Sequence, residues 1–326
     1  MVKPKKKRRI FVIATDSAGC WWYRLRLPLM ALDHHEFEVI WEPPFNNWQP
    51  GDIVIGQRIA GDNTAWLEMC AEPGLTAIYD IDDNLLEIDP ANTVPYRIFA
   101  PMVDGTAKNI AAAQVVTAST PKLAARLLEL NPNTVVLPNF LHSSWISRVT
   151  MPGLSPGPQP FVVGWAGSPF HGQDFGGVPE TLLAYARREP RAHFHVIGGD
   201  PTAGLVGRRT SPFTDMHSYW GLLDFDIGLI FLNDSIQNQC KSWVKALEYM
   251  GRGAVPVAPR IGQYEDLIIH GENGLLYDSI NELPDLLLTL SDDAQRSKMS
   301  DSAIGTAAIN TIEQQVPRWE AVYREA

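Results

Sequence analysis

The sequence predicts an α/β protein built from two Rossmann-like domains. The chain has 326 residues, which is long for a single hydrophobic core. In each half, an apolar run (residues 9–14 and 161–165) precedes a glycine-bearing turn and a helical segment, the usual start of a doubly wound domain. Between the halves, residues 151–160 are rich in Pro and Gly and lack periodicity, which indicates a linker.

The composition is that of a soluble protein with a large core. Hydrophobic residues make up 45% of the chain and charged residues 20%. No apolar run approaches the roughly 20 residues of a membrane helix, and the one after the basic start is too short for a secretory signal. Cys20, Cys70 and Cys240 are scattered, which argues against disulfides and a zinc site. We therefore expect a cytoplasmic protein, in the host cytoplasm if a phage encodes it.

The net charge of −10 is unevenly distributed, because residues 3–9 carry six positive charges. An acidic protein is a poor nonspecific ligand of nucleic acid. The basic arm is either a solvated tail or a contact for nucleic acid, an anionic membrane surface or a nuclear importer.

Alternating and helical patterns predict the remaining elements. Strands are expected at residues 37–41, 52–55, 134–137, 193–197, 225–232 and 254–258, and within 76–84 and 110–116. Helices are expected at 22–32, 121–130, 178–188, 284–290, 293–304 and 312–323. The resulting division is a basic tail (1–9), an N-terminal domain (10–150), the linker (151–160), a C-terminal domain (161–308) and a last segment (309–326).

The stretch from 238 to 277 carries the strongest functional signal. On a helix, Lys241, Lys245 and Glu248 share one narrow face, and apolar side chains occupy the opposite face. The charged face is either solvated or a binding surface. The order of a polar loop, this helix, a glycine break, a buried strand and a Gly-rich loop favours binding. The lysines can then meet a diphosphate while the glutamate accepts hydrogen bonds from ribose hydroxyls.

This stretch resembles the C-terminal signature of nucleotide-sugar glycosyltransferases with the GT-B fold, especially the group found in bacteriophage and in bacterial surface-polysaccharide clusters. The matching residues are Asn238, Lys241, Ser242, Lys245, Leu247, Glu248, Tyr249, Gly253, Pro256, Glu265, Gly271 and Gly274. One departure is Cys240, which stands where many retaining relatives carry a second glutamate. The resemblance also implies that the two domains face a cleft and that the final helix, in residues 309–326, crosses back to the N-terminal domain.

The start of the second half resembles the donor-domain opening of the same family. The pattern Gly-x-x-Gly-Ser-x-x-His-x-x-Asp falls on Gly164, Gly167, Ser168, His171 and Asp174. Free backbone N–H groups at the following helix favour anions. The resemblance implies a donor site formed by Gly167, Ser168, His171, Asp174, Ser242, Glu248, Glu265, Gly271 and Gly274. The backbone at Gly199 is a further candidate, as a surface for the nucleotide base.

The first turn lacks a GxGxxG fingerprint and carries aromatic residues and an arginine instead. Trp22 and Tyr23 can stack on sugar rings and Arg24 can clamp a phosphate. The alternative is that a tryptophan belongs to the core and Arg24 pairs with a carboxylate. The turn also resembles the family's Asp-x-x-Gly-x-x-x-Tyr-Arg start, which places Asp16 and Gly19 at the interdomain cleft.

An acidic run follows in the N-terminal half. Alternation puts Asp80 and Asp82 on one side of a strand, with Asp83 at its exit. Carboxylates this close need a cation, hydrogen-bond donors or a raised pKa. They either hold the Arg24 region or act on the acceptor, with Asp82 or Asp83 as orienting group or base. We expect no metal here. Gln57-Arg58 would lie at the carboxyl end of another strand, where open α/β sheets bind ligands.

The resulting hypothesis is a metal-independent, retaining glycosyltransferase. It would move a sugar from a UDP- or GDP-sugar, a donor substrate and not a tightly bound cofactor, to an acceptor hydroxyl. Lys241, Lys245 and Arg24 would stabilise the departing diphosphate, and Asp83 would act at the acceptor. Polysaccharide, glycolipid, protein and modified DNA bases all stay open as acceptors. The alternatives are a nucleotide-sugar epimerase of the same fold and a non-catalytic sugar-nucleotide binding protein.

Overall fold

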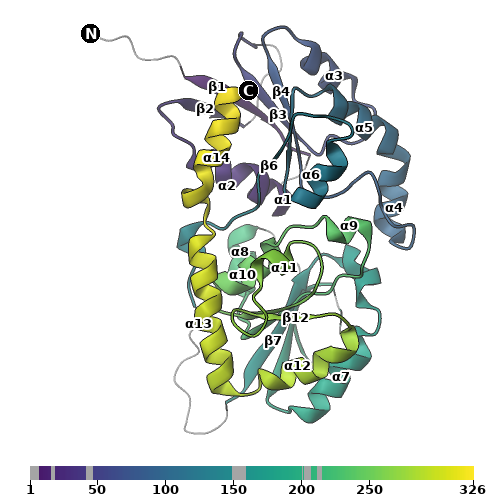
Figure 1. Ribbon diagram of the computed structural model, residues 1–326, viewed down its shortest axis with the longest axis vertical. Coiled ribbons are helices and arrows are strands. Elements are labelled where there is room, and N and C mark those ends of the chain that lie inside the picture. Colours follow the sequence, from purple (N-terminus) through teal and green to yellow (C-terminus); the bar gives the residue numbers. More distant parts are fainter. Residues whose placement is uncertain are drawn as a thin grey trace. The chain divides into compact units, whose positions relative to one another are not determined.

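The computed structural model describes residues 7–15, 19–41, 47–148, 159–199, 201, 207–210 and 215–326. The chain divides into two compact units, which are treated separately below (Figure 1). Unit 1 consists of Met1–Asn139, Cys240–Ser242 and Ile312–Ala326, and unit 2 of Phe140–Gln239 and Trp243–Thr311. The change between units at Asn139 comes earlier than the predicted linker, most of which lies outside the described residues.

Unit 1 contains a six-stranded parallel sheet within the described residues, in the order β2-β1-β3-β4-β5-β6. Its strands are β1 (Arg8–Ile13), β2 (Phe37–Ile40), β3 (Ile53–Gln57), β4 (Thr76–Ile81), β5 (Val115–Ala118) and β6 (Thr134–Val136). β3 and β4 are buried on both faces, as the continuous apolar runs in their sequence indicate. Arg8 and Arg9 belong to β1 rather than to the predicted tail. Arg9 also pairs with Asp52.

The helices of unit 1 include a π-helix that follows α1 near the end of β1. They are α1 (Gly19–Trp21), the π-helix η1 (Trp22–Arg26), α2 (Leu27–Ala31), α3 (Thr64–Ala71), α4 (Thr93–Phe99), η2 (Ala100–Met102), α5 (Val103–Ala112), α6 (Pro121–Leu127) and α14 (Ile312–Glu325). Pro28 lacks an N–H group, which fits the irregular helix at the predicted kink. α14 packs against α2, with Trp319 and Tyr323 buried (Figure 1).

Unit 2 contains a second six-stranded parallel sheet within the described residues, in the order β12-β11-β10-β7-β8-β9. Its strands are β7 (Phe161–Gly167), β8 (Ala192–Gly198), β9 (Gly207–Thr210), β10 (Ile227–Leu229), β11 (Val255–Pro259) and β12 (Leu275–Tyr277). Of the predicted strand at 225–232, only the three residues of β10 form a strand. The prediction of two Rossmann-like domains is confirmed.

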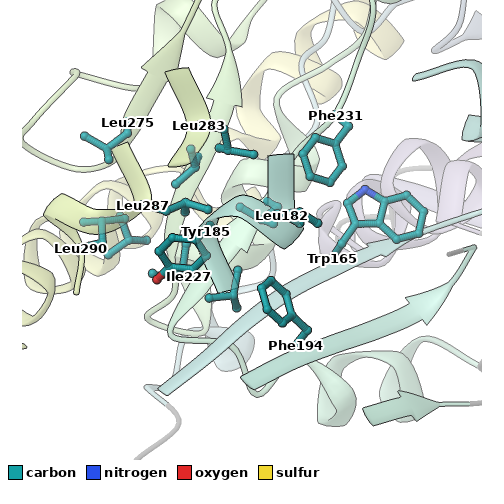
Figure 2. Close-up of a cluster of buried hydrophobic side chains, with 14 of the residues drawn as sticks. Trp165, Leu182, Tyr185, Phe194, Ile227, Phe231, Leu275, Leu283, Leu287 and Leu290 are labelled. Carbon is teal, nitrogen blue, oxygen red and sulfur yellow. The ribbon is translucent and has the colours of Figure 1, made fainter. Parts of the chain in front are cut away.

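The helices of unit 2 cover both faces of this sheet. They are η3 (Ser143–Trp145), η4 (Pro169–Phe175), α7 (Val178–Arg188), α8 (Met216–Leu222), α9 (Ile236–Gln239), α10 (Val244–Gly251), α11 (Tyr264–Leu267), η5 (Ile280–Glu282), α12 (Leu283–Thr289) and α13 (Asp293–Ile309). α7 packs on α12, and α10 on α13. Figure 2 shows Leu182 and Tyr185 of α7 in one buried cluster with Leu283, Leu287 and Leu290 from α12 and its end.

In each sheet, successive strands are added first towards one edge and then towards the other. Ligands are expected at the point where this direction changes. In unit 1 the reversal lies between β1 and β3, and in unit 2 between β7 and β10. At such a point the two flanking connections leave on opposite faces, which opens a crevice at the carboxyl ends of the strands. The loops after β1, β3, β7 and β10 are therefore the first places to search for a site. In the described part of the chain, every helix is too short or too polar to cross a membrane.

Candidate functional site

The two glycines at the carboxyl ends of β7 and β8 hold these strands in close contact. Gly198 has a φ of +88°, and a Cβ atom there would lie 2.0 Å from the carbonyl oxygen of Gly167. The N–H of Gly199 donates to that same carbonyl at 3.0 Å. The role of Gly199 as a surface for the nucleotide base stays a prediction, and its N–H group is already bonded within the fold.

His171 and Asp174 share one turn, as the sequence pattern suggested, and Asp174 is the centre of a network. His171 Nδ1 lies 2.9 Å from Asp174 Oδ2. The other oxygen, Oδ1, accepts hydrogen bonds from the backbone N–H of Asn233 at 2.9 Å and from Asn238 Nδ2 at 2.8 Å. Only 8% of Asp174 is exposed. Asp174 therefore fixes the loop after β10, and Ser168 lies exposed at the start of the same turn.

The predicted helix through Lys241, Lys245 and Glu248 is interrupted. α9 ends at Gln239 and α10 begins at Val244. The Thr120 hydroxyl donates to the Cys240 carbonyl at 2.9 Å, and Asn139 Nδ2 donates to Ser242 Oγ at 3.0 Å. These bonds replace the helical pattern, so Cys240, Lys241 and Ser242 belong to unit 1. The predicted common face of the two lysines is wrong. Ser242 accepts a hydrogen bond from Asn139 of the same unit, and its part in the donor site stays a prediction.

Lys245 forms the centre of a polar cluster in unit 2. Its ammonium donates to Tyr219 Oη at 2.7 Å and to Glu248 Oε2 at 2.8 Å. Tyr219, on α8, also donates its hydroxyl to Glu248 at 2.6 Å. An ammonium has three donors, and these bonds use two of them. The Lys245 side chain is 27% exposed, so the cation is oriented but accessible.

Glu248 is buried beside Lys245 and Tyr219. Only 3% of the residue is exposed, and its Oε2 accepts bonds from both Lys245 and Tyr219. These bonds hold Lys245 in place, and the contact of Glu248 with ribose hydroxyls stays a prediction. Tyr219 was absent from the sequence-based site, because nothing in its local sequence indicates that α8 lies beside α10.

A cavity of about 390 Å³ opens at the carboxyl ends of β7, β10, β11 and β12. Its wall includes Asp174, Asp234 and Asp278, with Arg260 as the single basic residue. Arg260 is already paired with Asp278 at 3.0 Å. The volume is within the range of small-molecule sites. The excess of carboxylates favours hydroxyl donors over a diphosphate.

The glycine loop before β12 lies at the wrong edge of the sheet for the predicted role. Gly271 and Gly274 precede β12, and Gly274 packs on Pro256 near the start of β11, with 2.8 Å between its ideal Cβ and the Pro256 ring. The N–H of Gly271 donates to the Gly274 carbonyl at 2.9 Å. The loop is a tight structural turn at the amino ends of the strands. Glu265 lies exposed at the start of α11, and its role towards the donor sugar stays a prediction.

Arg24 is enclosed in unit 1, as the alternative interpretation of the first turn expected. It donates to Asp80 Oδ1 at 2.7 Å, to Asn139 Oδ1 at 3.1 Å and to the Leu137 carbonyl. Thr117 completes the pair by donating to Asp80 at 2.6 Å. Burial alone would lower the pKa of Arg24, but the charge of Asp80 and its hydrogen bond raise it. With 1% of the residue exposed, the predicted phosphate clamp is corrected to a structural ion pair.

A second charged cluster lies at the carboxyl ends of β3 and β4 in unit 1. Arg58, which follows β3 with a φ of +51°, approaches Asp82 at 3.7 Å and Asp83 at 4.0 Å. Its Nη1 also lies 3.0 Å from Cys20 Sγ. Lys241 pairs with Asp83 at 3.2 Å. Arg58 was noted from the sequence only for its place at a strand end, and a positive φ at a non-glycine residue is typical of functional sites.

The burial of this cluster shifts the pKa values of two of its groups. Burial raises the pKa of Asp82, and the nearby charge of Arg58 opposes that rise. Burial also raises the pKa of the Cys20 thiol, which stays neutral. Candidate ligand atoms of Cys20, Asp82 and Asp83 lie within 4.8 Å of one another. The cations of Arg58 and Lys241 already balance the two carboxylates, however, so these residues fit a metal ion poorly.

The other predicted acceptor residues are divided between core and surface. Tyr23 is buried in unit 1, so the stacking predicted for its ring is corrected to core packing. Trp22 and Gly19 are partly exposed on η1 and α1. Asp16 lies outside the described residues.

Solved structures share this architecture. Sucrose-phosphate synthase from Thermosynechococcus elongatus aligns with a TM-score of 0.66 and 14% identity, over 98% of this chain and 99% of its own. Anabaena HepE in complex with UDP and glucose aligns with a TM-score of 0.63 and 15% identity, over 98% and 100%. The chain has the GT-B fold. That prediction is confirmed.

Another similar structure, TarM, aligns with a TM-score of 0.62 and 16% identity over 84% of this chain. The chain spans about half the length of TarM, because 55% of that protein is covered. No protein-family model matches the chain, and no curated protein sequence matches it.

Proposed function

We propose that this protein is a glycosyltransferase that moves a sugar from a nucleotide-diphosphate sugar to an acceptor hydroxyl. The observation that carries the proposal is the Lys245 cluster. Lys245 lies in the first turn of α10, which follows β10 at the carboxyl edge of a Rossmann-like sheet. Tyr219 and Glu248 hold its ammonium in one orientation. That edge is where such sheets bind nucleotides.

The chemistry requires charge stabilisation more than a nucleophile. When the glycosidic bond to the diphosphate breaks, negative charge grows on the leaving phosphate oxygens. A fixed ammonium with one unused donor stabilises this charge without reorganising, which is the most effective electrostatic arrangement. The buried carboxylate of Glu248 holds the Lys245 ammonium group in one position. In this proposal Lys245 is the catalytic residue and Glu248 and Tyr219 are positioning residues.

We propose a UDP-sugar as the donor, in preference to a GDP-sugar. HepE structures contain UDP, UDP-glucose, or UDP with glucose, and this chain has the same fold over nearly its full length. The cavity beside Asp174 and Asp234 would take the sugar, because carboxylates accept hydrogen bonds from hydroxyl groups. Its acidic wall disfavours the diphosphate, which is assigned to Lys245.

We place the acceptor on unit 1, at the cluster of Arg58 and Asp82. Asp82 Oδ1 is buried and has no hydrogen-bond partner among the described residues, although Arg58 lies 3.7 Å away. An acceptor hydroxyl would satisfy this oxygen. Asp83 is less suitable, because Lys241 already pairs with it. Asp82 is therefore the group proposed to orient the hydroxyl and receive its proton.

The test is incubation of the protein with a panel of UDP-sugars, with free UDP and the sugar product measured separately. Slow release of UDP and sugar supports transfer. An isomerised UDP-sugar would support an epimerase, and binding without turnover a non-catalytic protein. Lys245→Ala should lower the rate of UDP release about 10²–10³-fold, whereas Lys298→Ala, at an exposed lysine on α13, should leave it unchanged. The anomeric configuration of the first transferred product, read by NMR, decides between retention and inversion.

A further inference from the structure

Arg26 is held between two tryptophan rings at the carboxyl edge of the first sheet. Its guanidinium carbon lies 4.9 Å from the ring centroid of Trp41 and 5.8 Å from that of Trp21. The two rings are 6.0 Å apart and nearly perpendicular, at 68°. Trp21 ends α1, which starts after β1, and Trp41 directly follows β2. All three side chains are partly exposed.

The charge of Arg26 is not compensated within the described residues. It forms no hydrogen bond and no ion pair there. Other arginines that stack on aromatic rings all have such bonds, including Arg9 to Asp52, Arg296 to Asp293 and Arg324 to Glu36. Carboxylates are not scarce, since the chain has 37 acidic and 27 basic residues. Stacking on an indole fixes the guanidinium plane and leaves its N–H edge free for an oxyanion.

This position connects Arg26 to the acceptor side of the proposed reaction. Trp21 follows Cys20 in α1, and Arg58 lies 3.0 Å from the Cys20 sulfur. Arg58 in turn approaches Asp82. The Trp21–Arg26–Trp41 group and the Asp82 cluster are thus connected through adjacent residues at one edge of one sheet.

We propose that Arg26, Trp21 and Trp41 form an acceptor subsite that binds a sugar or polyol carrying a carboxylate or phosphate group. The assignment of this subsite to the acceptor rests on the proposed function, but the predicted binding of an anionic sugar does not depend on it. The indole faces pack on the apolar face of a sugar ring, and the guanidinium forms charge-assisted bonds to the oxyanion. A neutral acceptor would leave this guanidinium without a partner, so the site selects anionic acceptors.

The test measures binding to the full chain without any donor, so that it is independent of transferase activity. The probes are glucuronate for the carboxylate, glycerol 1-phosphate for the phosphate and methyl glucoside as the neutral sugar, titrated while the arginine Nε–H signals are followed by NMR. We expect at least one anionic probe to shift the Arg26 signal and to bind at least about tenfold more tightly than the neutral sugar, as suits charge-assisted bonds. The probe that binds best identifies the anionic group.

Matched variants separate binding from structure. Arg26→Gln should weaken the anionic probe about tenfold or more, with the neutral sugar unaffected. Arg97→Gln, an exposed arginine on α4 of the same unit, should change nothing. Arg26→Lys keeps the charge and should retain part of the affinity. Equal binding of all three probes by the unaltered protein, or full affinity in Arg26→Gln, would overturn the proposal. The comparison of the three probes uses the unaltered protein, so it does not depend on whether a variant folds.

Discussion

Arg24 in unit 1 and Lys245 in unit 2 were both predicted to stabilise the departing diphosphate, and the structure treats them in opposite ways. The Arg24 side chain is fully buried and bonded to Asp80, Asn139 and a backbone carbonyl. The Lys245 side chain is 27% exposed and keeps one donor unused by the bonds described. A cation near a strand end is therefore a candidate for catalysis only when its own fold leaves a donor for the ligand.

The largest expected effect is a loss of stability when Arg24 is replaced. Arg24→Met leaves the carboxylate of Asp80 buried without its cation, and loss of one partner of a buried pair costs about 3–5 kcal/mol. The free energy of unfolding, measured by denaturant titration, should fall by that amount. Adding Asp80→Asn should recover a large part of the loss. A fully stable Arg24→Met protein with reduced turnover would return Arg24 to the catalytic site.

Replacement of Lys245 should have the opposite result, a large loss of activity with little loss of stability. Lys245→Ala should lower the turnover of the UDP-sugar substrate about 10²–10³-fold, as loss of one preorganised donor does. Its unfolding free energy should stay close to that of the unaltered protein, because the residue is partly exposed. Steady-state kinetics and denaturant titration on the same samples check both halves. Activity within twofold of normal would remove Lys245 from the mechanism.

A smaller effect tests the corrected role of the glycine loop. Gly274→Ala places a Cβ 2.8 Å from the Pro256 ring and backbone, so we expect a loss of about 1–3 kcal/mol in unfolding free energy from overpacking. The KM for the UDP-sugar should not change, because the loop lies at the amino ends of the strands. A raised KM in a stable variant would restore the predicted donor contact.

The smallest expected effect concerns Asp82 and pH. Burial raises the pKa of Asp82 in the folded protein, so folding favours the protonated carboxyl group. That contribution to stability is present below the unfolded pKa and is lost as the pH rises through the folded one. Asp82→Asn removes it, so the stability of the variant relative to the unaltered protein should increase as the pH rises above the ordinary aspartate pKa of about 3.9. A difference in unfolding free energy that does not vary with pH would contradict the raised pKa.

The sequence predicted the architecture well because strand ends depend on local patterns. The buried runs of β1, β3, β4 and β7 and the turns after them were placed within a few residues, which also placed Arg58 and His171 at sheet edges. The helix through Lys241 was wrong because bonds from Thr120 and Asn139, distant in sequence, override the local helical pattern. Burial of Arg24 and the partnership of Glu248 with Tyr219 likewise depend on tertiary contacts that no spacing encodes.

The most direct test of the central claim is a crystal structure of the protein with a bound UDP-sugar. The account predicts a diphosphate oxygen within about 2.7–3.2 Å of Lys245 Nζ, with Tyr219 and Glu248 still bonded to that ammonium. A diphosphate bound in the acidic cavity beside Asp234, or a Lys245 side chain that makes no contact with the ligand, would contradict it.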